Sequence, residues 1–447
     1  MPNLRDPRGR AELFLVVSLL AVAFVARYVG RTEVTGDMEI FFRWHAKLQQ
    51  AGGWRGLGAE IGNYNAPYMY LLYLASLLPG SLLIGIKVVY ATFDLLLAYF
   101  TYRLVEMHRG RRTGIFAALI MIMLPTVVLN ASVWGQIDSM WASFAVGGVW
   151  MLARGRAWWG VTLCTLSLAF KPHGIFIFAL VGLLVLAGRI KARVLLAVPV
   201  VWLVLSLPAL LLGRNPVELF TIYSLDRQSG IIRFLTWGAP TIYAFMGGTK
   251  RLDTLRTLGY VLTAALVLGV FLAVLARRIR LDPTRIVTLA ALFSILIPFG
   301  LPGMHDRYFF LADVTTLILA FYRPRLWFVP LLVQAASLGS YQWYLFGRSG
   351  DYLNLKVLAA LMLAALIAIG YTLARDVLDG PFENSGEPPR TTSGEPPHSA
   401  SGEPSRTASG EPSRTVEDTA RESAAPSRAL PDVTPLPPKA VGNTIGG

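Results

Sequence analysis

Long apolar runs, separated by short polar segments, fill the first 374 residues of the 447-residue chain. A helix that crosses a membrane needs about 20 mostly apolar residues, because lipid offers its backbone no hydrogen-bond partners. The runs of spanning or near-spanning length are 12–30, 81–102, 114–130, 138–153, 158–170, 174–188, 194–212, 257–276, 286–301, 308–322, 326–345 and 353–374. We therefore predict an all-α polytopic membrane protein, with about 12 transmembrane helices in one domain over residues 1–374.

Two apolar segments near the N-terminus need separate treatment. The first run is preceded by arginines, like a signal peptide, but Arg27 and Tyr28 follow it where a cleavage site would need small residues. We predict that this run is retained as the first helix. The segment 66–79 is short and contains two prolines, so we predict a re-entrant or interfacial helix in the first extracytoplasmic loop.

Composition agrees with this pattern and argues against a soluble, a nucleic-acid-binding or a disulfide-bonded protein. With 54% hydrophobic residues, 15% charged residues and a mean hydropathy of +0.52, the chain lies outside the range of soluble domains. Residues 1–374 contain 34 basic and 16 acidic side chains, a net charge of +18, and residues 375–447 contain 7 and 11, a net charge of −4, so the positive excess of the chain belongs to the membrane part. Such charge sets topology and contacts anionic lipid, which leaves a nucleic-acid partner without support. The single cysteine, Cys164, excludes an intrachain disulfide and a thiolate metal site.

The distribution of Lys and Arg among the short loops predicts the orientation of the chain. Basic residues gather in alternate loops, which the positive-inside rule places in the cytoplasm together with both termini. The conspicuous polar clusters fall at the opposite ends of the predicted helices, at 35–45, 60–68, 130–138, 171–173, 226–237 and 303–308. We therefore expect an extracytoplasmic site. Richness in Arg, Ala and Leu is typical of a high-GC bacterium, so the plasma membrane of a bacterium is the expected location.

Residues 375–447 differ in character from the rest of the chain. Four octapeptides follow one another from 385 to 416: SGEPPRTT, SGEPPHSA, SGEPSRTA and SGEPSRTV. A polar, proline-rich repeat cannot bury enough apolar surface to fold. We predict a disordered cytoplasmic tail without a catalytic part, and a role as a tether or partner site stays open.

An acid stands directly after the first apolar run, in the stretch GDMEIFFRWH. Asp37 and Glu39 are followed by aromatic residues at helical spacing, which predicts an amphipathic helix at the membrane interface. Such acids are ordinarily solvated; a carboxylate held rigidly at the membrane edge for chemistry is the alternative. Because side chains at i and i+2 face different ways on a helix, we expect no metal site there.

Two further clusters combine polar and aromatic residues. Trp134, Gln136 and Asp138 in WGQID fit either an aromatic-belt turn with a helix cap or part of a site. Lys171 and His173 interrupt an otherwise apolar region. Lys171 either snorkels toward water or marks a functional position, because ionisable groups at membrane depth are costly and usually functional.

The stretch GMHDRYFF brings His305, Asp306 and Arg307 together before a late apolar run. An internal Asp306–Arg307 ion pair is one interpretation, and phosphate binding by Arg307 with His305 is the other. Asp94 and Asp313 lie inside predicted helices. We expect them to make structural polar contacts between helices.

In their order along the chain, these motifs resemble the GT-C class of membrane glycosyltransferases, and within it bacterial relatives of the second mannosyltransferase of GPI-anchor assembly. The resemblance covers about residues 10–375 and rests on the acid after the first helix, NYNAPY, WGQID, KPH and MHDRY. It implies a polyprenyl-phosphate sugar as donor, an extracytoplasmic glycan or glycolipid as acceptor, and Asp37 as general base. Many relatives have a second aspartate where Met38 or Glu39 stands, and a glutamate is frequent at the place of Asp306. The transferred hexose, mannose first, therefore stays open.

The chemistry of sugar transfer from a lipid phosphate assigns roles to the other polar residues. A base must take the proton of the acceptor hydroxyl, and cations must stabilise the departing phosphate at headgroup depth. We expect the donor phosphate to be bound by Arg307, Lys171 and His305, with Arg227 or Arg233 of the long outer loop as a helper. We expect the sugar or the acceptor to be bound by Gln136, Asp138, Trp134, Asn63, Tyr64, Asn65, Glu39 and His173. One base without an enzyme nucleophile implies inversion, while retention through a nucleophilic Asp138 stays open. No cofactor is expected.

Two other classes stay open from the sequence. A polytopic transporter or a flippase of lipid-linked glycans would place polar residues toward the bilayer midplane and would have two similar halves, and the sequence shows neither feature. A non-catalytic assembly protein would recruit partners through its basic loops and its tail. It would not need acids, histidines and arginines together on one face.

Overall fold

The computed structural model describes residues 7–224, 234–246, 252–345, 347 and 353–379. Contacts divide the chain into two units, 1–385 and 386–447, and every described residue belongs to the first. The SGEP repeats, the rest of the predicted tail from residue 380 onward, Arg227 and Arg233 lie outside the described residues.

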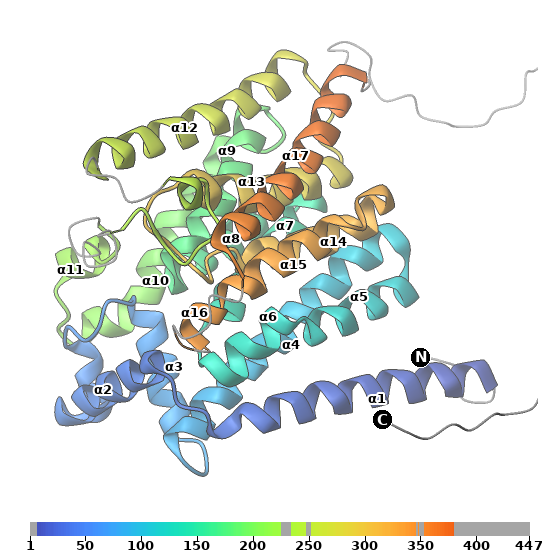
Figure 1. The fold of residues 1–447 in the computed structure, drawn as a ribbon. Coiled ribbons are helices and arrows are strands. Elements are labelled where there is room, and N and C mark those ends of the chain that lie inside the picture. The colour runs from blue at the N-terminus through green and yellow to red at the C-terminus, as the bar shows by residue number, and fades with distance from the viewer. Residues whose placement is uncertain (1–6, 225–233, 247–251, 346, 348–352, 380–447) are drawn as a thin grey trace, which may run out of the picture. The chain divides into compact units, whose positions relative to one another are not determined.

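The described part of the chain is almost entirely helical, as predicted (Figure 1). The α-helices are α1 (Pro7–Val29), α2 (Gly36–Gln50), α3 (Ala66–Ser76), α4 (Leu82–Arg109), α5 (Arg111–Met123), α6 (Pro125–Val128), α7 (Asp138–Ala153), α8 (Ala157–Phe170), α9 (Phe178–Leu186), α10 (Ala197–Leu211), α11 (Pro216–Thr221), α12 (Leu252–Ala276), α13 (Pro283–Gly300), α14 (Phe310–Tyr322), α15 (Val329–Ser340), α16 (Gln342–Leu345) and α17 (Leu355–Asp379). The short 3-10 segments are η1 (Gly30–Thr32), η2 (Gly53–Gly58), η4 (Pro172–Ile177), η5 (Ala192–Leu196), η7 (Ile242–Phe245) and η8 (Pro324–Leu326), and η3 (Leu129–Trp134) is a π-helix.

Local sequence signals set several of these boundaries. The side chain of Ser81 accepts a hydrogen bond from the Ile84 amide and caps α4, and Asp282 caps α13 in the same way through the Arg285 amide at 2.9 Å. Gly110 separates α4 from α5 with a φ of 80°, a left-handed value that favours glycine. These signals lie within a few residues of the boundaries they set, so they can be read from the sequence.

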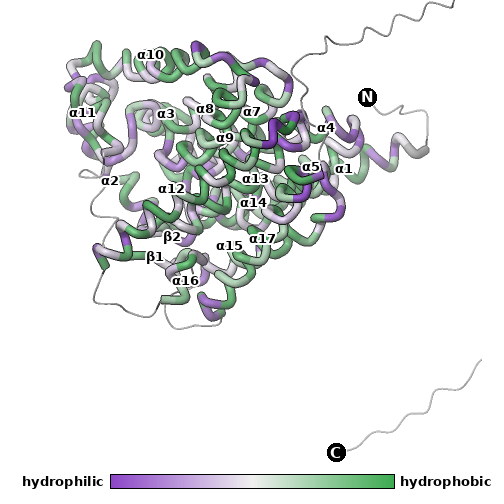
Figure 2. Tube along the Cα trace, turned by 90° about the horizontal axis from the view of Figure 1, so that it is seen from above, coloured by the Kyte–Doolittle hydropathy of each residue, from purple (hydrophilic) through white to green (hydrophobic). Residues whose placement is uncertain are grey.

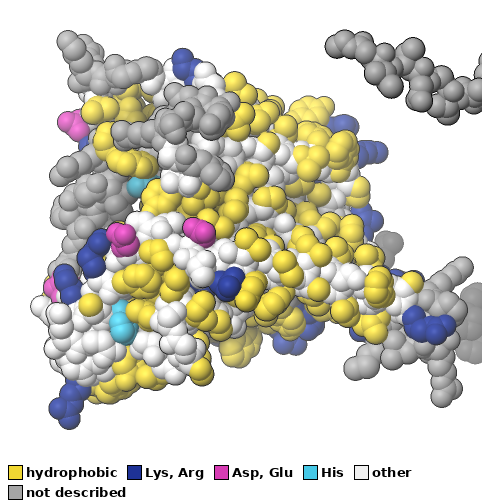
Figure 3. All heavy atoms as spheres, turned by 60° about the horizontal axis from the view of Figure 1, so that its bottom comes forward, with side chains coloured by type: hydrophobic (Ala, Val, Ile, Leu, Met, Phe, Trp, Pro, Cys, Tyr) yellow, Lys and Arg dark blue, Asp and Glu magenta, His cyan; other side chains and the backbone are white. Residues whose placement is uncertain are grey.

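The helices pack around α7, which contacts α4 on one side and α8 on another. Close approach of α7 and α8 depends on Gly148, since a Cβ there would lie 2.5 Å from the sulfur of Cys164. On the outside, α1, α10 and α12 expose many leucine and valine side chains. Figure 2 shows that most of the helical trace is hydrophobic, and Figure 3 shows hydrophobic side chains over most of the described part of one face. This distribution is expected of a chain whose solvent is lipid.

Within the described residues, six helices are long and apolar enough to cross a membrane, or seven if the bent pair Arg111–Met123 and Pro125–Trp134 forms one span. Each of the twelve predicted apolar runs contains a helix, but several of these helices are shorter than a membrane span. The multi-pass prediction is therefore confirmed, while the count of twelve stays a prediction. At 66–79 the structure has α3, whose 11 residues are too few to cross a bilayer.

Two buried aspartates connect helices, as expected. Asp94 of α4 forms an ion pair with Arg27 of α1 at 2.8 Å and accepts a hydrogen bond from Ser139 of α7. Asp313 of α14 accepts a hydrogen bond from Ser337 of α15 at 2.9 Å. Both predicted structural roles are confirmed.

A short parallel pair of strands positions the segment before α14. β1 (Thr236–Trp237) pairs with β2 (Met304–His305), and the Asp306 amide donates to the Trp237 carbonyl at 3.1 Å. These backbone bonds hold His305, Asp306 and Arg307 in the segment between the end of α13 and the start of α14.

Candidate active site

Most of the predicted polar clusters meet around one cavity of about 390 Å³, a size typical of small-molecule sites. It is bounded by α2, the loop before α3, the segment around η4 and the segment between β2 and α14. The residues that line it are Asp37, Ile40, Phe41, Trp44, Gly62, Asn63, Tyr64, Gln136, Lys171, Pro172, His173, His305, Arg307 and Tyr308. The site therefore combines residues that are up to 271 positions apart in the sequence, from Asp37 to Tyr308.

The first turn of α2 holds Asp37 at the edge of this cavity. Thr35 caps the helix by accepting from the Met38 amide, and its hydroxyl donates to the Trp134 carbonyl at 2.6 Å. The backbone amide of Asp37 donates to the Tyr344 hydroxyl at 2.9 Å. The predicted helix after Asp37 is confirmed, and its N-terminus is tied to two distant segments.

The Asp37 carboxylate is bound through one of its two oxygens. Oδ2 accepts from Trp134 Nε1 at 2.8 Å and from Gln136 Nε2 at 2.6 Å, and lies 3.5 Å from Arg307 Nη1. Oδ1 makes no hydrogen bond or ion pair with the residues that the structure describes. The side chain is 18% exposed and lines the cavity. One oxygen is thus fixed while the other is available to a bound molecule.

The Asp138 carboxylate is enclosed, in contrast. Its Oδ1 accepts from Trp141 Nε1 at 2.8 Å and pairs with Lys171 Nζ, and its Oδ2 accepts from Asn130 Nδ2 at 2.8 Å. Lys171 is only 2% exposed, so the interpretation that it snorkels toward water is wrong. Asp138 and Lys171 thus form a buried, hydrogen-bonded ion pair, which holds structure at the site.

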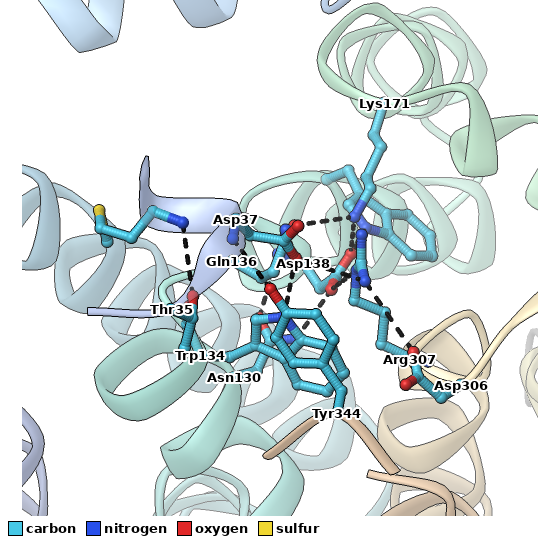
Figure 4. Close-up of polar contacts among 12 residues, drawn as sticks. Thr35, Asp37, Asn130, Trp134, Gln136, Asp138, Lys171, Asp306, Arg307 and Tyr344 are labelled. Atoms are coloured by element: carbon cyan, nitrogen blue, oxygen red, sulfur yellow. Dashed lines mark hydrogen bonds and ion pairs between the residues drawn. The ribbon is translucent and has the colours of Figure 1, made fainter. Parts of the chain in front are cut away.

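Gln136 links Asp37 to Lys171, the ion-pair partner of Asp138. Its amide nitrogen donates to Asp37, and its amide oxygen lies 3.5 Å from Lys171 Nζ. Figure 4 shows Lys171 and Arg307 approaching Gln136, Asp37 and Asp138 from different elements. The WGQID segment therefore supplies the contacts that connect the first loop with the KPH and MHDRY segments.

Arg307 lies among three carboxylates without being saturated by any of them. Its guanidinium is 3.5 Å from Asp37, 3.8 Å from Asp138 and 3.9 Å from Asp306. It is 12% exposed, and Nε has no hydrogen-bond partner among the described residues. Although burial lowers its pKa, the surrounding carboxylates raise the pKa above its usual range, so the group is a permanent cation. The Asp306–Arg307 pair exists, and it leaves donors for an oxyanion.

The two histidines at the cavity are neutral groups rather than cations. Burial lowers the pKa of His305 to about 3. The ring of His173 is buried with its Nδ1 unpaired among the described residues, and its centroid lies 3.7 Å from that of Tyr308. Both rings line the cavity, where a neutral imidazole can donate or accept a hydrogen bond. No group of three or more His, Cys, Asp or Glu side chains suited to a metal occurs in the described part of the chain.

The predicted site residues divide into those that line the cavity and those that do not. Asp37, Asn63, Tyr64, Gln136, Lys171, His173, His305 and Arg307 line it. Trp134 and Asp138 lie behind the lining and contact it through Asp37 and Lys171. Asn65 is buried as the cap of α3, and Glu39 is 62% exposed beside Arg43. Neither of these two belongs to the lining that the structure describes.

Several residues of the site were not predicted from the sequence. Asn130 and Trp141 hold Asp138, and Tyr344 stacks on Trp134 with ring centroids 4.4 Å apart. Thr35 had a local signal, because a threonine before an acidic first turn is a helix cap. Tyr344 had none, since it is 307 residues from Asp37.

Lys87 of α4 was also missed, although a lysine inside an apolar run is a signal. Its buried ammonium donates to the carbonyls of Gly30 and Glu33, each at 2.6 Å, and of Ser132 at 2.7 Å. A Cβ on Gly30 would lie 2.9 Å from the Ser132 carbonyl oxygen, so glycine permits this approach. The hydrogen bonds of Lys87 therefore hold the segment before Asp37 against the segment before Trp134.

Comparison with known proteins gives one family and four similar chains of solved structures, two of which are described below. The family described as "Glycosyltransferase family 87" matches residues 63–298, just over half of the chain. The crystal structure of ArnT from Cupriavidus metallidurans bound to undecaprenyl phosphate is similar with a TM-score of 0.47 and 18% identity, covering 81% of this chain and 77% of that one. Its apo state gives a TM-score of 0.46 and 17% identity, with coverages of 82% and 78%. No curated protein matches the sequence.

Proposed function

The chain belongs to glycosyltransferase family 87, and from this premise we propose that it transfers a hexose, mannose first, from a polyprenyl-phosphate sugar to an extracytoplasmic glycan or glycolipid. Asp37 is the general base of this reaction, and the sugar carbon is inverted. Transport, the alternative from the sequence, does not account for membership of a glycosyltransferase family. Both termini are cytoplasmic in this proposal, and the cavity opens on the other side.

The environment of Asp37 carries the proposal. A general base must be held rigidly and must still have a lone pair within reach of the acceptor hydroxyl. Trp134 and Gln136 hold Oδ2, and Oδ1 makes no hydrogen bond or ion pair with the described residues. The contacts on Oδ2 fix the orientation of the carboxylate and leave Oδ1 to accept the proton.

Arg307 is the group best placed for the donor phosphate. Its guanidinium lines the cavity, lies 3.5 Å from Asp37, and has donors that the three nearby carboxylates do not fill. A planar guanidinium suits phosphate oxygens, and its charge would stabilise the phosphate as it leaves the sugar. Lys171 has its charge balanced by Asp138, and His305 is neutral, so they would contribute hydrogen bonds.

Inversion is favoured by the enclosure of Asp138. Retention would need a second carboxylate at the sugar carbon as nucleophile. Both oxygens of Asp138 are engaged by Asn130, Trp141 and Lys171, and Asp138 does not line the cavity. Asn63, Tyr64 and His173 remain in the lining for the sugar or the acceptor.

The test is transfer of labelled sugar from a panel of polyprenyl-phosphate sugars, mannose first, to membrane extract by purified full-length protein. Wild type should transfer one of these sugars, and Asp37→Asn should lower the rate by about 10² to 10⁴. Glu39→Gln is the matched control, because it neutralises an acid on the same helix turn outside the cavity lining, and should stay within about twofold of wild type. Equal transfer by wild type and Asp37→Asn would remove Asp37 as the base.

A further inference from the structure

A second cavity lies at the other ends of α13 and α14. The first cavity adjoins the segment between these helices, whereas the second is lined by the start of α13, the end of α14, η8 and the end of α17. The 18 residues of α13 correspond to about 27 Å, roughly the thickness of a hydrocarbon core. The second cavity has a volume of about 770 Å³. Because it lies at the opposite ends of these helices, it is separate from the candidate active site.

The charges of this second cavity are unbalanced. Its lining contains four arginines and two aspartates. Arg285 and Arg323 are directed at the same carboxylate, that of Asp376: Arg285 Nε lies 3.8 Å away, and Arg323 Nη2 donates to it. Arg323 also donates to Thr288 at 2.9 Å. These two arginines are part of the helix packing.

The other two arginines are available. Arg325 is exposed and makes no hydrogen bond or ion pair within the part of the chain that the structure describes. Arg375 has an ion pair with Asp379 at 3.5 Å, in which both side chains are more than 60% exposed. Such exposed pairs are weak, so Arg375 can exchange Asp379 for a better partner.

Aromatic side chains next to this cavity place it at the depth of lipid headgroups. Trp327 follows η8 and is 64% exposed, and Tyr371 of α17 lines the cavity and is 65% exposed. Exposed Trp and Tyr gather where hydrocarbon meets headgroups. A ligand there would meet apolar surface on one side and guanidinium groups on the other.

We propose that this second cavity binds the phosphate headgroup of an anionic phospholipid through Arg325 and Arg375. Two guanidinium groups with uncommitted donors match the oxygens of one phosphate, and the net positive charge of the lining selects an anionic lipid over a zwitterionic one. The site is independent of sugar transfer, because its residues lie at the opposite helix ends from Asp37.

Native mass spectrometry of the full-length protein, released from micelles that contain phosphatidylglycerol or phosphatidylcholine, tests this site. Wild type should retain phosphatidylglycerol in preference to phosphatidylcholine. The double variant Arg325→Gln/Arg375→Gln should lower phosphatidylglycerol retention about tenfold or more. The matched control is Arg111→Gln/Arg277→Gln, which removes the same charge from exposed arginines outside the cavity and should change retention less than twofold.

Equal loss in the two double variants would overturn the proposal, because it would show that lipid responds to total charge. Equal retention of the two lipids by wild type would overturn it as well. An excess of inorganic phosphate that displaces the lipid completely would show that a free anion is the ligand. Unchanged thermal unfolding of Arg325→Gln/Arg375→Gln is expected, since neither arginine is buried.

Discussion

The carboxylates of Asp37 and Asp138 share Arg307 but occupy different environments. Asp37 is bound through one oxygen at the edge of a cavity, whereas both oxygens of Asp138 are engaged behind the lining, and its side chain is 1% exposed. A carboxylate with a free lone pair can take a proton, and a carboxylate in a saturated buried pair holds structure. The same residue type, a few ångströms from one arginine, is therefore expected to do chemistry in one place and packing in the other.

The largest effect, on the free energy of unfolding, is expected from neutralising Asp138. Asp138→Asn leaves the buried ammonium of Lys171 without its counter-charge. Removing one partner of a buried pair costs about 3–5 kcal/mol, so the free energy of unfolding in detergent should fall by that amount. Asp37→Asn should change it by less than about 1 kcal/mol.

The double variant Asp138→Leu/Lys171→Met is the control for Asp138→Asn. Replacing both charges by apolar groups should recover most of the lost stability. An Asp138→Asn protein that unfolds like wild type but transfers no sugar would contradict the comparison, because Asp138 would then take part in the chemistry.

The second-largest effect, on the KM for the lipid donor, is expected from replacing Arg307, the cation that both carboxylates share. Arg307→Lys keeps the charge but loses the fork that faces Asp37, Asp138 and the cavity. Loss of charged hydrogen bonds of about 1.5–3 kcal/mol should raise the KM for the lipid donor about 10- to 100-fold. Steady-state kinetics with varied donor measures this.

Arg43→Lys is the matched control for Arg307→Lys. It makes the same chemical change on an arginine of α2 that is 64% exposed, and it should leave the donor KM within about twofold of wild type. If Arg307→Lys lowered kcat with an unchanged donor KM, Arg307 would act by holding Asp37 rather than by binding the phosphate.

The smallest effect concerns pH and the third carboxylate beside Arg307. Burial raises the pKa of Asp306 to about 7, against the opposing effect of Arg307. Below pH 7 the Asp306 carboxyl is neutral, and above it a negative charge 3.9 Å from Arg307 competes with the donor phosphate. The donor KM of wild type should therefore rise about threefold between pH 6 and pH 8.

Asp306→Asn should flatten this rise, because the asparagine does not titrate. Asp253→Asn, which neutralises a carboxylate that is 96% exposed, should keep the profile of wild type. A profile that keeps its slope in Asp306→Asn would assign the titration to another group.

The sequence predicted much of this arrangement because its signals are local or additive. Apolar runs locate helices, since burial in lipid depends on the composition of each segment. The Lys and Arg distribution placed the clusters around Asp37, Gln136, Lys171 and Arg307 on one face, and the structure brings these four residues to one cavity. Glu39 was assigned to the site, but it does not line the cavity, since side chains at i and i+2 of a helix point in different directions.

The sequence by itself determined the helical membrane class, the segments that contain helices and the identities of the ionisable groups available to a site. Only the tertiary structure decided which oxygen of Asp37 is held, that Lys171 pairs with Asp138, and that the Tyr344 hydroxyl accepts a hydrogen bond from the backbone amide of Asp37, 307 residues away. Helix formation and hydropathy depend on neighbouring residues, whereas contacts between side chains depend on how whole helices pack. The role of each charge follows from that packing, because burial and partners set what a charged group can do.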